Sequence, residues 1–321
     1  MSSSDCCNKR AFTINPQSKK VYCKKHFMEF IEKRVQKTIS RYGMLAKDDH
    51  VALGFSGGKD SAVLLKILLK LKRRHPNCKL TVLTVDEGIK GYREECLELT
   101  QKQTEAYLID HVIVSFKDLY GVTLDQVVAK SHQNNNGAPA CTYCGLLRRR
   151  ALNLAARKIG ATKIATAHNL DDEAQSIVMN LLRGDVGKFI RFSRRSSSED
   201  PPLIPRIRPL VRISEPEIVL YAMASQIEYH DIPCPYAASA MRNDIRTFLS
   251  EMEAKRPSTL INIVNAHDDL LKYFPISTTV WKDPIRCKIC REISSQDICP
   301  VCQFREKLGI KASGHRFFSY P

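Results

Sequence analysis

The stretch that decides the fold is Val51-Ala52-Leu53-Gly54-Phe55-Ser56-Gly57-Gly58-Lys59-Asp60-Ser61. It begins as a short apolar strand, and after it apolar side chains recur at helical spacing as far as Leu71, which predicts a helix. The two adjacent glycines let the backbone turn and bring N–H groups close to an anion, and the helix directs its positive end to the same point. A plain turn would explain the glycines, but not Lys59 and Ser61 at fixed offsets. The sequence therefore predicts a phosphate-binding loop.

This loop is not the G-x4-G-K-[ST] loop of the commoner nucleotide-binding proteins, because Asp60 follows the lysine and only one residue of the loop precedes the glycines. The hexapeptide from Ser56 to Ser61 instead resembles the signature of the PP-loop ATP pyrophosphatases. That resemblance implies cleavage of ATP between its α and β phosphates and adenylation of a carbonyl-type oxygen.

The chain around the loop alternates strands and helices. Further strands are expected at 80–85, 112–114 and 163–167, and helices at 93–106, 144–159 and 172–182. Near-continuous apolar strands separated by helices predict an α/β fold with a doubly wound, Rossmann-like parallel sheet. Ligands bind beyond the carboxyl ends of such strands, and Ser56, Asp86 and His168 each follow a strand. We expect these three residues to face one cleft.

The charge balance points to a polyanionic partner. Among 321 residues, 50 Lys and Arg exceed 34 Asp and Glu and give a formal charge of +16, which favours nucleic acid. The basic residues gather at 72–74, 148–150 and 191–195 and at Arg206, Arg208 and Arg212, although each run alone is typical of a solvated surface. No apolar run approaches the ~20 residues of a membrane span, and the N-terminus has no apolar signal segment. We expect a cytoplasmic protein without membrane contact.

The C-terminal cysteines have the spacing of a zinc ribbon. Twelve cysteines in a chain without an export signal are expected to be metal ligands or catalytic groups before they are disulfides. The pattern C-x2-C-x8-C-x2-C occurs in a short segment that has too few apolar residues for its own core, and it comprises Cys287, Cys290, Cys299 and Cys302. Four thiolates leave no open position, so this zinc would be structural.

The N-terminal cysteines give a weaker zinc signal. Cys23 and His26 form a normal C-x2-H half-site. A C-x2-C partner would need a cysteine where Ser4 stands, so Cys7 with either Cys6 or Asp5 must complete the shell. Free thiols on a flexible end are the alternative. We expect three parts in the chain: a zinc module at 1–27, a catalytic domain at 28–255, and a helical linker with the zinc ribbon at 256–321.

Three further cysteines remain after both zinc candidates and the isolated Cys78 and Cys96. Cys141 and Cys144 form a C-x2-C pair at the start of a helix, and Cys234 lies in a proline-flanked turn. Three thiolates without a nearby histidine suit a [4Fe–4S] cluster with one free iron, a redox or persulfide-carrying trio, or a third structural zinc. Spacing alone does not choose between these three sites.

Nearly the whole chain resembles the two-zinc-finger subgroup of tRNA 2-thiouridine synthetases in the TtcA/TtuA family. The resemblance extends over the Cys/His N-terminus, 56–61, 86–93, 115–120, 141–149, 167–172, 182–185, Cys234 and the four terminal cysteines. It implies that Cys141, Cys144 and Cys234 hold a [4Fe–4S] cluster. The segments 86–93 and 115–120 are more similar to the branch that modifies wobble position 34 than to the branch that modifies position 54.

The resemblance also implies where ATP lies. The phosphates would lie on Gly54 and Ser56 to Ser61, and the adenine end near Asp86, Ala167 and His168. Mg2+ and Lys59 would neutralise the leaving pyrophosphate. The uridine O2 would attack the α-phosphorus, and a sulfur nucleophile would then displace AMP at C2. The remaining catalytic candidates are Asp60 and Asp172 for metal or proton transfer, with an N-cap as the alternative for Asp172, and Arg148 for phosphate binding.

Several expectations about partners accompany this reading. The sulfur donor would be sulfide, a persulfide carrier or a thiocarboxylated ubiquitin-like protein, and the enzyme would be a homodimer or a heterodimer with a paralogue. The target base would be flipped into the cleft. Two rivals differ in class: a PP-loop ligase that amidates a carboxylate with ammonia, and a zinc-ribbon nucleic-acid adaptor without catalysis. The ligase would not need the cysteine trio or the excess of positive charge.

Overall fold

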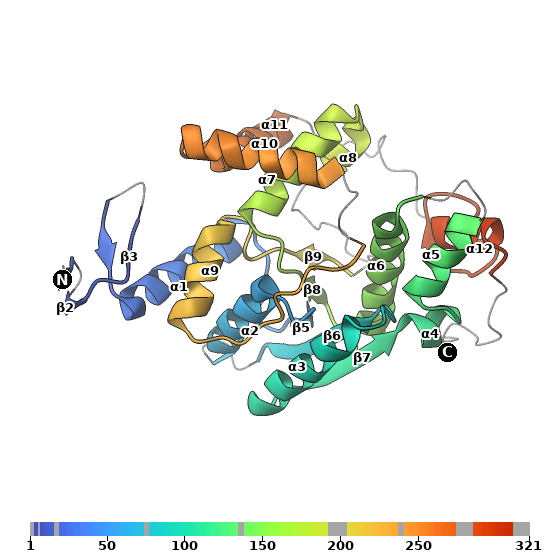
Figure 1. Ribbon diagram of the computed structural model, residues 1–321, viewed down its shortest axis with the longest axis horizontal. Helices are drawn as coiled ribbons and strands as arrows, with labels where there is room; N and C mark the ends of the chain where they lie inside the picture. Colours follow the sequence, from blue (N-terminus) through green and yellow to red (C-terminus); the bar gives the residue numbers. More distant parts are fainter. Residues whose placement is uncertain are drawn as a thin grey trace.

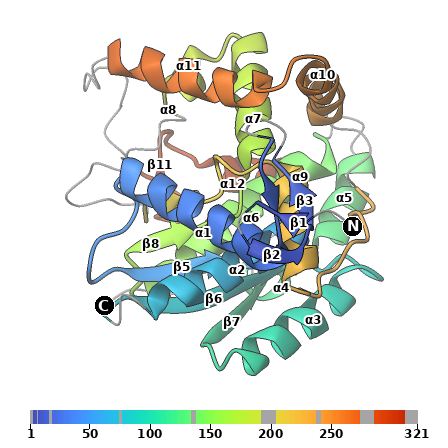
Figure 2. The same cartoon turned by 90° about the vertical axis from the view of Figure 1, so that its left-hand side faces the viewer.

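The computed structural model describes residues 3–5, 7–15, 19–73, 77–133, 138–191, 204–236, 241–273 and 285–310. At its centre is a parallel sheet with strand order β7-β6-β5-β8-β9 (Figures 1 and 2). The strands are β5 (His50–Gly54), β6 (Lys79–Asp86), β7 (His111–Ser115), β8 (Lys163–Ala165) and β9 (Arg206–Ile207). The order reverses at β5, so the ligand-binding crevice of a doubly wound sheet falls at the carboxyl end of this strand. The predicted fold class is confirmed.

Helices cover both faces of the sheet. Their bounds are α1 (Lys24–Arg41), α2 (Lys59–Lys72), α3 (Arg93–Ala106), α4 (Phe116–Tyr120), α5 (Leu124–Gln133), α6 (Ala140–Lys158), α7 (Leu170–Leu182), α8 (Val186–Arg191), α9 (Glu215–Ala224), α10 (Met241–Lys255) and α11 (Thr259–Tyr273). Residues of β5 alternate between two cores, because side chains along a strand point to opposite faces. Val51 and Leu53 pack with α1, α2 and α9, whereas Ala52 packs with α4, α5 and α6.

A separate helical layer stands over the carboxyl ends of the strands. It has its own small core, in which Leu170 and Ile177 of α7 pack against Leu249 of α10 and Val264 of α11 (Figure 1). Because of this position, the layer covers the crevice at the carboxyl ends of the strands. In the described part of the chain, no helix is both long and apolar enough to cross a membrane.

Small cysteine-bearing modules flank the main domain and lie at opposite ends of its long axis (Figure 1). The N-terminal module contains the hairpins β1 (Ser3–Ser4) with β2 (Cys7–Arg10) and β3 (Thr13–Ile14) with β4 (Val21–Tyr22). The C-terminal module contains β10 (Ile285–Arg286), β11 (Ile293–Ser294) and α12 (Pro300–Lys307), and it packs against α6.

Some boundaries differ from those expected. Helix α6 begins at Ala140, so that both cysteines of the C-x2-C pair lie in its first turns. Strand β8 ends two residues earlier than expected. Strand β9 is not predicted by the sequence pattern, because it has only two residues and adjoins prolines. Residues 134–137 and 192–203, the latter including most of the basic run at 191–195, lie outside the described residues.

Candidate active site

The phosphate loop joins β5 to α2 as the sequence predicts. Gly57 has φ +86°, a conformation that side chains rarely adopt, and a Cβ here would lie 3.3 Å from Thr100 Cγ2. Gly58 is the N-cap of α2, so Ser61 lies in the first turn of the helix. The Ser61 hydroxyl donates to the Gly58 carbonyl at 2.9 Å and accepts from the Ser56 amide at 3.3 Å. The hydroxyl therefore holds the loop closed around its backbone N–H groups.

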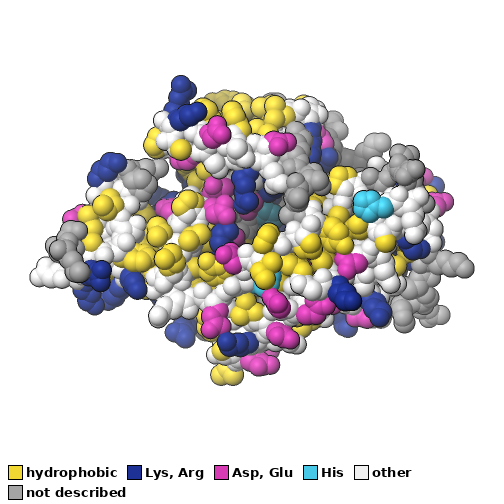
Figure 3. Space-filling view, in the orientation of Figure 1, with side chains coloured by type: hydrophobic (Ala, Val, Ile, Leu, Met, Phe, Trp, Pro, Cys, Tyr) yellow, Lys and Arg dark blue, Asp and Glu magenta, His cyan; other side chains and the backbone are white. Residues whose placement is uncertain are grey.

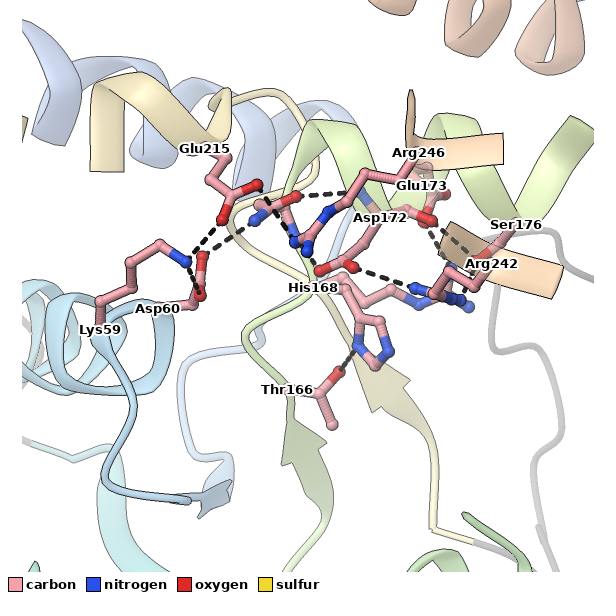
Figure 4. A network of polar contacts seen from close by, with 12 residues as sticks. Lys59, Asp60, Thr166, His168, Asp172, Glu173, Ser176, Glu215, Arg242 and Arg246 are labelled. Atoms are coloured by element: carbon pink, nitrogen blue, oxygen red, sulfur yellow. Dashed lines mark hydrogen bonds and ion pairs between the residues drawn. The ribbon is translucent and has the colours of Figure 1, made fainter. Parts of the chain in front are cut away.

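Two carboxylates hold Lys59 in place. Its Nζ lies 2.6 Å from Glu215 Oε1 and 3.3 Å from Asp60 Oδ2 (Figure 4). Burial lowers the pKa of Lys59, but the hydrogen bond to Glu215 and the attraction of Asp60 outweigh it, so the pKa is raised overall. Glu215 stands at the N-terminus of α9 and also contacts Arg246 at 3.3 Å. The lysine is thus charged and is held where a polyphosphate would replace its carboxylate partners.

Glu215 was missed at the sequence level, although the sequence contains a signal for it. Ser214 and Glu217 form a capping box, an S-x-x-E pattern that marks the start of α9 and places Glu215 in its first turn. The backbone N–H of Glu215 donates to Asp171 Oδ2 at 2.8 Å. Four carboxylates, those of Asp60, Asp171, Asp172 and Glu215, thus belong to one polar network beside the phosphate loop.

Asp172 is not the N-cap of its helix, contrary to one of the two roles expected for it. The N-cap of α7 is Asn169, and Asp172 is the third residue of the capping box. Its carboxylate accepts from the Asn169 backbone at 3.3 Å and from Arg242 Nη1 at 3.0 Å. Asn169 Nδ2 in turn donates to Asp60 Oδ1 at 2.9 Å. Burial raises the pKa of both Asp60 and Asp172, so this network concentrates negative charge at an energetic cost.

The other predicted nucleotide-contacting residues follow neighbouring strands. Asp86 ends β6 and accepts from the Gly88 amide at 2.8 Å. His168 follows β8, and its Nδ1 lies 3.0 Å from Thr166 Oγ1 (Figure 4). Burial, and after it the positive charge of Arg208, lowers the pKa of His168 to about 4, so the imidazole is neutral at pH 7. Figure 3 shows a hollow at this place, below the helical layer, where acidic, basic and His side chains gather.

A chain of ion pairs connects the phosphate loop to the cysteine pair. Arg93 donates to the Ser56 carbonyl at 3.1 Å and to the Val85 carbonyl at 2.6 Å. Its Nε lies 3.0 Å from Glu87, and these two side chains are 5% and 6% exposed. Glu87 also lies 3.5 Å from Arg148 Nε. Glu87 and Arg93 therefore belong to the site. The sequence alone assigned neither residue a role, because both lie within the segment 86–93, which carried only the family resemblance.

Arg148 completes the connection, because its Nη2 lies 3.3 Å from Cys144 Sγ. Burial raises the pKa of the Cys144 thiol, and Arg148 counteracts this effect. The Cys141 thiol is exposed and donates to the Tyr236 carbonyl at 3.4 Å. This contact brings the turn that carries Cys234 to the start of α6, where Cys234 interacts electrostatically with Cys141 and Cys144. The three thiols share one neighbourhood, although their sulfurs are not all within 4.8 Å of one another.

The segment before Cys234 also contacts the phosphate loop. The backbone N–H of His230 donates to the Gly57 carbonyl at 2.9 Å, and its ring stacks edge-on against Tyr92. One stretch of chain, from 226 to 236, therefore contacts the phosphate loop in its middle and the C-x2-C pair at its end. The predicted nucleotide residues and the predicted sulfur residues adjoin the same crevice.

The four C-terminal cysteines are arranged as metal ligands. Their Sγ atoms all lie within 4.8 Å of one another, and the residues are Cys287, Cys290, Cys299 and Cys302. Arg150 of α6 donates to Cys290 Sγ at 3.1 Å and to Cys299 Sγ at 3.4 Å. The pKa of Cys290 is lowered, first by its hydrogen bond with Cys299 and also by Arg150. This closed set of four sulfurs, with a cation to balance it, can hold a metal ion.

The N-terminal cluster has three ligand atoms among the described residues, those of Cys7, Cys23 and His26, all within 4.8 Å of one another. Cys6 lies outside the described residues. Asp5 does not complete the shell, because its carboxylate accepts from the Val21 amide at 2.7 Å instead. Ser4 Oγ, however, lies 3.4 Å from Cys7 Sγ, at the place where the C-x2-C pattern has a sulfur.

Comparisons with known proteins agree with this arrangement. A PP-loop domain model matches residues 27–253. The chain is 38% identical to cytoplasmic tRNA 2-thiolation protein 1 of Aspergillus niger over 94% of this chain and 87% of that protein, and 38% identical to the Danio rerio protein of the same name over 95% and 88%. It superposes on the U34-tRNA thiolase NcsA from Methanococcus maripaludis, solved with its [4Fe-4S] cluster, with a TM-score of 0.83, 32% identity and coverage of 97% and 98%.

The phosphate loop, the adjoining cysteine trio and this similarity over nearly the full length point to one assignment. The chain belongs to the PP-loop family and, within it, to the tRNA 2-thiolation proteins.

Proposed function

We propose that the protein converts uridine in tRNA to 2-thiouridine, at wobble position 34, with ATP as the activating substrate. The single observation that carries this proposal is the segment 226–236, which joins the phosphate loop at Gly57 to Cys141 at the start of α6. Activation and sulfur delivery thereby share one crevice. The names of the relatives support the substrate and the cytoplasmic location, and the name of the archaeal thiolase supports position 34.

The adenylation step uses the residues around the phosphate loop. The loop N–H groups at the start of α2 hold the phosphates of ATP, and the uridine O2 attacks the α-phosphorus in line with the departing pyrophosphate. Lys59 exchanges its contacts with Glu215 and Asp60 for the negative charge of the leaving group. The carboxylates released in this way, together with Asp172, are suited to bind Mg2+. Asp86, Ala167 and His168 border the place proposed for the adenine.

The sulfur step takes place at the cysteine trio. Three thiolates without histidine fit a [4Fe-4S] cluster with one iron unligated by protein, and such an iron supplies a coordination site for sulfide. Cys141, Cys144 and Cys234 would hold the cluster, and Arg148 balances the charge of the thiolates beside Cys144. Sulfur then displaces AMP at C2 of the adenylated uridine. A persulfide on one cysteine is the alternative carrier.

Two zinc ions are proposed for the flanking modules. The C-terminal four-cysteine set would bind a structural zinc, because it offers no open position. The N-terminal set would bind zinc through Cys7, Cys23 and His26, with Cys6 or the Ser4 hydroxyl as a fourth ligand.

We further propose a homodimer or a heterodimer with a paralogue, and a sulfide, persulfide or thiocarboxylate donor. Exposed Leu181, Leu182 and Val186 at the end of α7 and the start of α8 favour an apolar contact there.

The experiment is thiolation by anaerobically purified protein with ATP, sulfide and tRNA transcripts, read as 2-thiouridine by mass spectrometry of the nucleosides. Transcripts with cytidine at position 34 or at position 54 assign the modified base. Cys234→Ser is expected to abolish thiolation and to leave pyrophosphate release intact. Cys78→Ser, which alters an isolated thiol near Ala46, is the matched control.

Three results would overturn the proposal. Unchanged thiolation by the Cys234→Ser variant would remove the sulfur site. Tight tRNA binding without any release of pyrophosphate from ATP would instead indicate the nucleic-acid adaptor. Consumption of ammonia and a carboxylate with release of pyrophosphate would indicate the ligase.

A further inference from the structure

The structure sorts six of the basic residues predicted to bind nucleic acid, those at 148–150 and Arg206, Arg208 and Arg212, into compensated and uncompensated ones. Four of them contact acidic or thiol groups: Arg148 contacts Glu87, Arg150 contacts Cys290, Arg208 contacts Glu173 at 2.8 Å, and Arg212 contacts Asp268 at 3.9 Å. Arg149 and Arg206 differ from these. Within the described ranges, no carboxylate lies within ion-pair distance of either one.

The two uncompensated arginines lie together. Arg206 of β9 donates through Nη2 to the backbone carbonyl of Arg149 in α6 at 2.9 Å. Burial and then the neighbouring Arg149 lower the pKa of Arg206 to about 10. Like charges held together without a counter-charge are unfavourable to the empty fold. An anion bound from outside would relieve this cost.

The helix leaves room for this arrangement at Gly145. A Cβ at this position would lie 3.3 Å from Arg149 Nη1, so the guanidinium folds back over the turn that contains Cys144. Arg149 is exposed, and its positive charge therefore faces solvent beside the sulfur end of α6. An anion bound here would lie next to the proposed site of sulfur transfer.

The pair is separate from the phosphate loop. Arg206 is in register with Ile164 of β8, which is in register with Ala52 of β5, so it lies two strands from β5. With strands ~4.8 Å apart, this separation is about 10 Å across the sheet. Arg206 is also four residues short of Ser56 in register, toward the amino ends of the strands. The backbone that carries Arg206 is thus displaced from the phosphate loop itself, whereas a long RNA reaches both places.

We propose that Arg149 and Arg206 form a subsite for a backbone phosphodiester of the RNA substrate, close to the nucleotide that enters the crevice. This inference rests on the proposed function, because it takes tRNA as the substrate. Two guanidiniums from a helix and from an edge strand suit the tetrahedral oxygens of a phosphate, which Arg binds through paired N–H groups. The contact fixes the position of the RNA and carries no sequence information.

The test is the salt dependence of tRNA binding. Each phosphate contact contributes about 0.7 to 0.9 to the magnitude of the slope of log Kobs against log salt. Arg149→Gln is expected to lower the slope magnitude of the full-length protein by about that amount, and Arg206→Gln to do the same. Lys102→Gln is the control, because Lys102 of α3 pairs with Glu228 and loss of the lysine changes the net charge equally. Arg149 is exposed, so its variant keeps the test valid even if Arg206→Gln misfolds.

The outcomes separate this inference from the proposed function. A lower slope for Arg149→Gln, with an unchanged Kd for ATP measured without RNA, supports the subsite. A weaker Kd for ATP with an unchanged tRNA slope would overturn it and assign the pair to the nucleotide. Wild-type-like slopes in both arginine variants would overturn it as well, even when the wild-type protein thiolates tRNA. Failure of the wild-type protein to bind tRNA would instead overturn the proposed function.

Discussion

At the scale of single residues, Glu87 is central because it links two arginines of the site. Its carboxylate is 6% exposed and contacts both Arg93 and Arg148. Glu87→Gln leaves Arg93 as a buried charge without its partner, so we expect the free energy of unfolding to fall by about 3 kcal/mol or more. Urea denaturation with unchanged m measures this loss. A loss below ~1 kcal/mol, the size expected for the exposed pair of Lys102 and Glu228, would contradict it.

Lys59 gives a second prediction at this scale. Lys59→Ala removes the charge that opposes the leaving pyrophosphate, so we expect pyrophosphate release to fall by about 100-fold or more. Lys66→Ala on the same helix is the matched control, because Lys66 Nζ donates to the Ser225 carbonyl at 2.8 Å, at the end of α9. Equal activities of the two variants would show that Lys59 has no part in the reaction.

Asp171 gives a prediction about pH. Burial, and after it the nearby carboxylates of Glu215 and Asp172, raise its pKa. Because the folded pKa lies above the unfolded one, the wild-type protein loses stability as pH rises through the folded pKa. Asp171→Asn keeps an acceptor for the Glu215 amide and removes this loss. We expect a higher Tm than wild type at pH 8, and a difference that shrinks toward pH 4; a difference constant with pH would contradict this account.

At the scale of elements, α6 unites the two cysteine sites. Its first turns carry Cys141 and Cys144, and two turns later Arg150 contacts the C-terminal sulfurs. Near the end of the helix, Arg157 forms an ion pair with Glu292 of the C-terminal module at 2.7 Å. The module is thus fixed to the helix that also carries the proposed sulfur site.

The metal proposed for this module gives a prediction for the element. A short segment with two two-residue strands and one helix has little apolar core of its own, so bound metal stabilises its fold. We expect Cys290→Ser to lower the zinc content by about one ion per chain and to lower Tm. Cys78→Ser serves as the control, and elemental analysis with thermal unfolding makes the measurement. Unaltered zinc in the Cys290→Ser protein would exclude the ribbon as a zinc site.

The sequence predicts the long elements well and the short ones poorly. Strands β5, β6 and β7 are apolar runs between turns, and α3 has the expected bounds of 93–106. Strand β9 has two residues, too few for a periodic signal, and only pairing with β8 makes it a strand. Glu87 and Glu215 could not be given their roles from spacing, because their partners are 6 to 156 residues away along the chain. Such long-range ion pairs exist only once the sheet has formed.

At the scale of the whole molecule, the formal charge of +16 predicts strong dependence of RNA binding on salt. If tRNA contacts the main domain through four or more phosphates, log Kobs falls with log salt with a slope steeper than about −3. Filter binding between 50 and 300 mM salt measures it. A slope near zero would mean that the positive field plays no part in recognition.

The short chain from 226 to 236 has a consequence for the order of events. The His230 amide is hydrogen-bonded to the Gly57 carbonyl. A phosphate loop that rearranges around ATP therefore also displaces the segment whose end lies beside Cys141. Sulfur would then reach the target uridine only when ATP is bound. The sulfur atom, which is easily oxidised, would in this way not be transferred before an adenylated uridine is present to accept it.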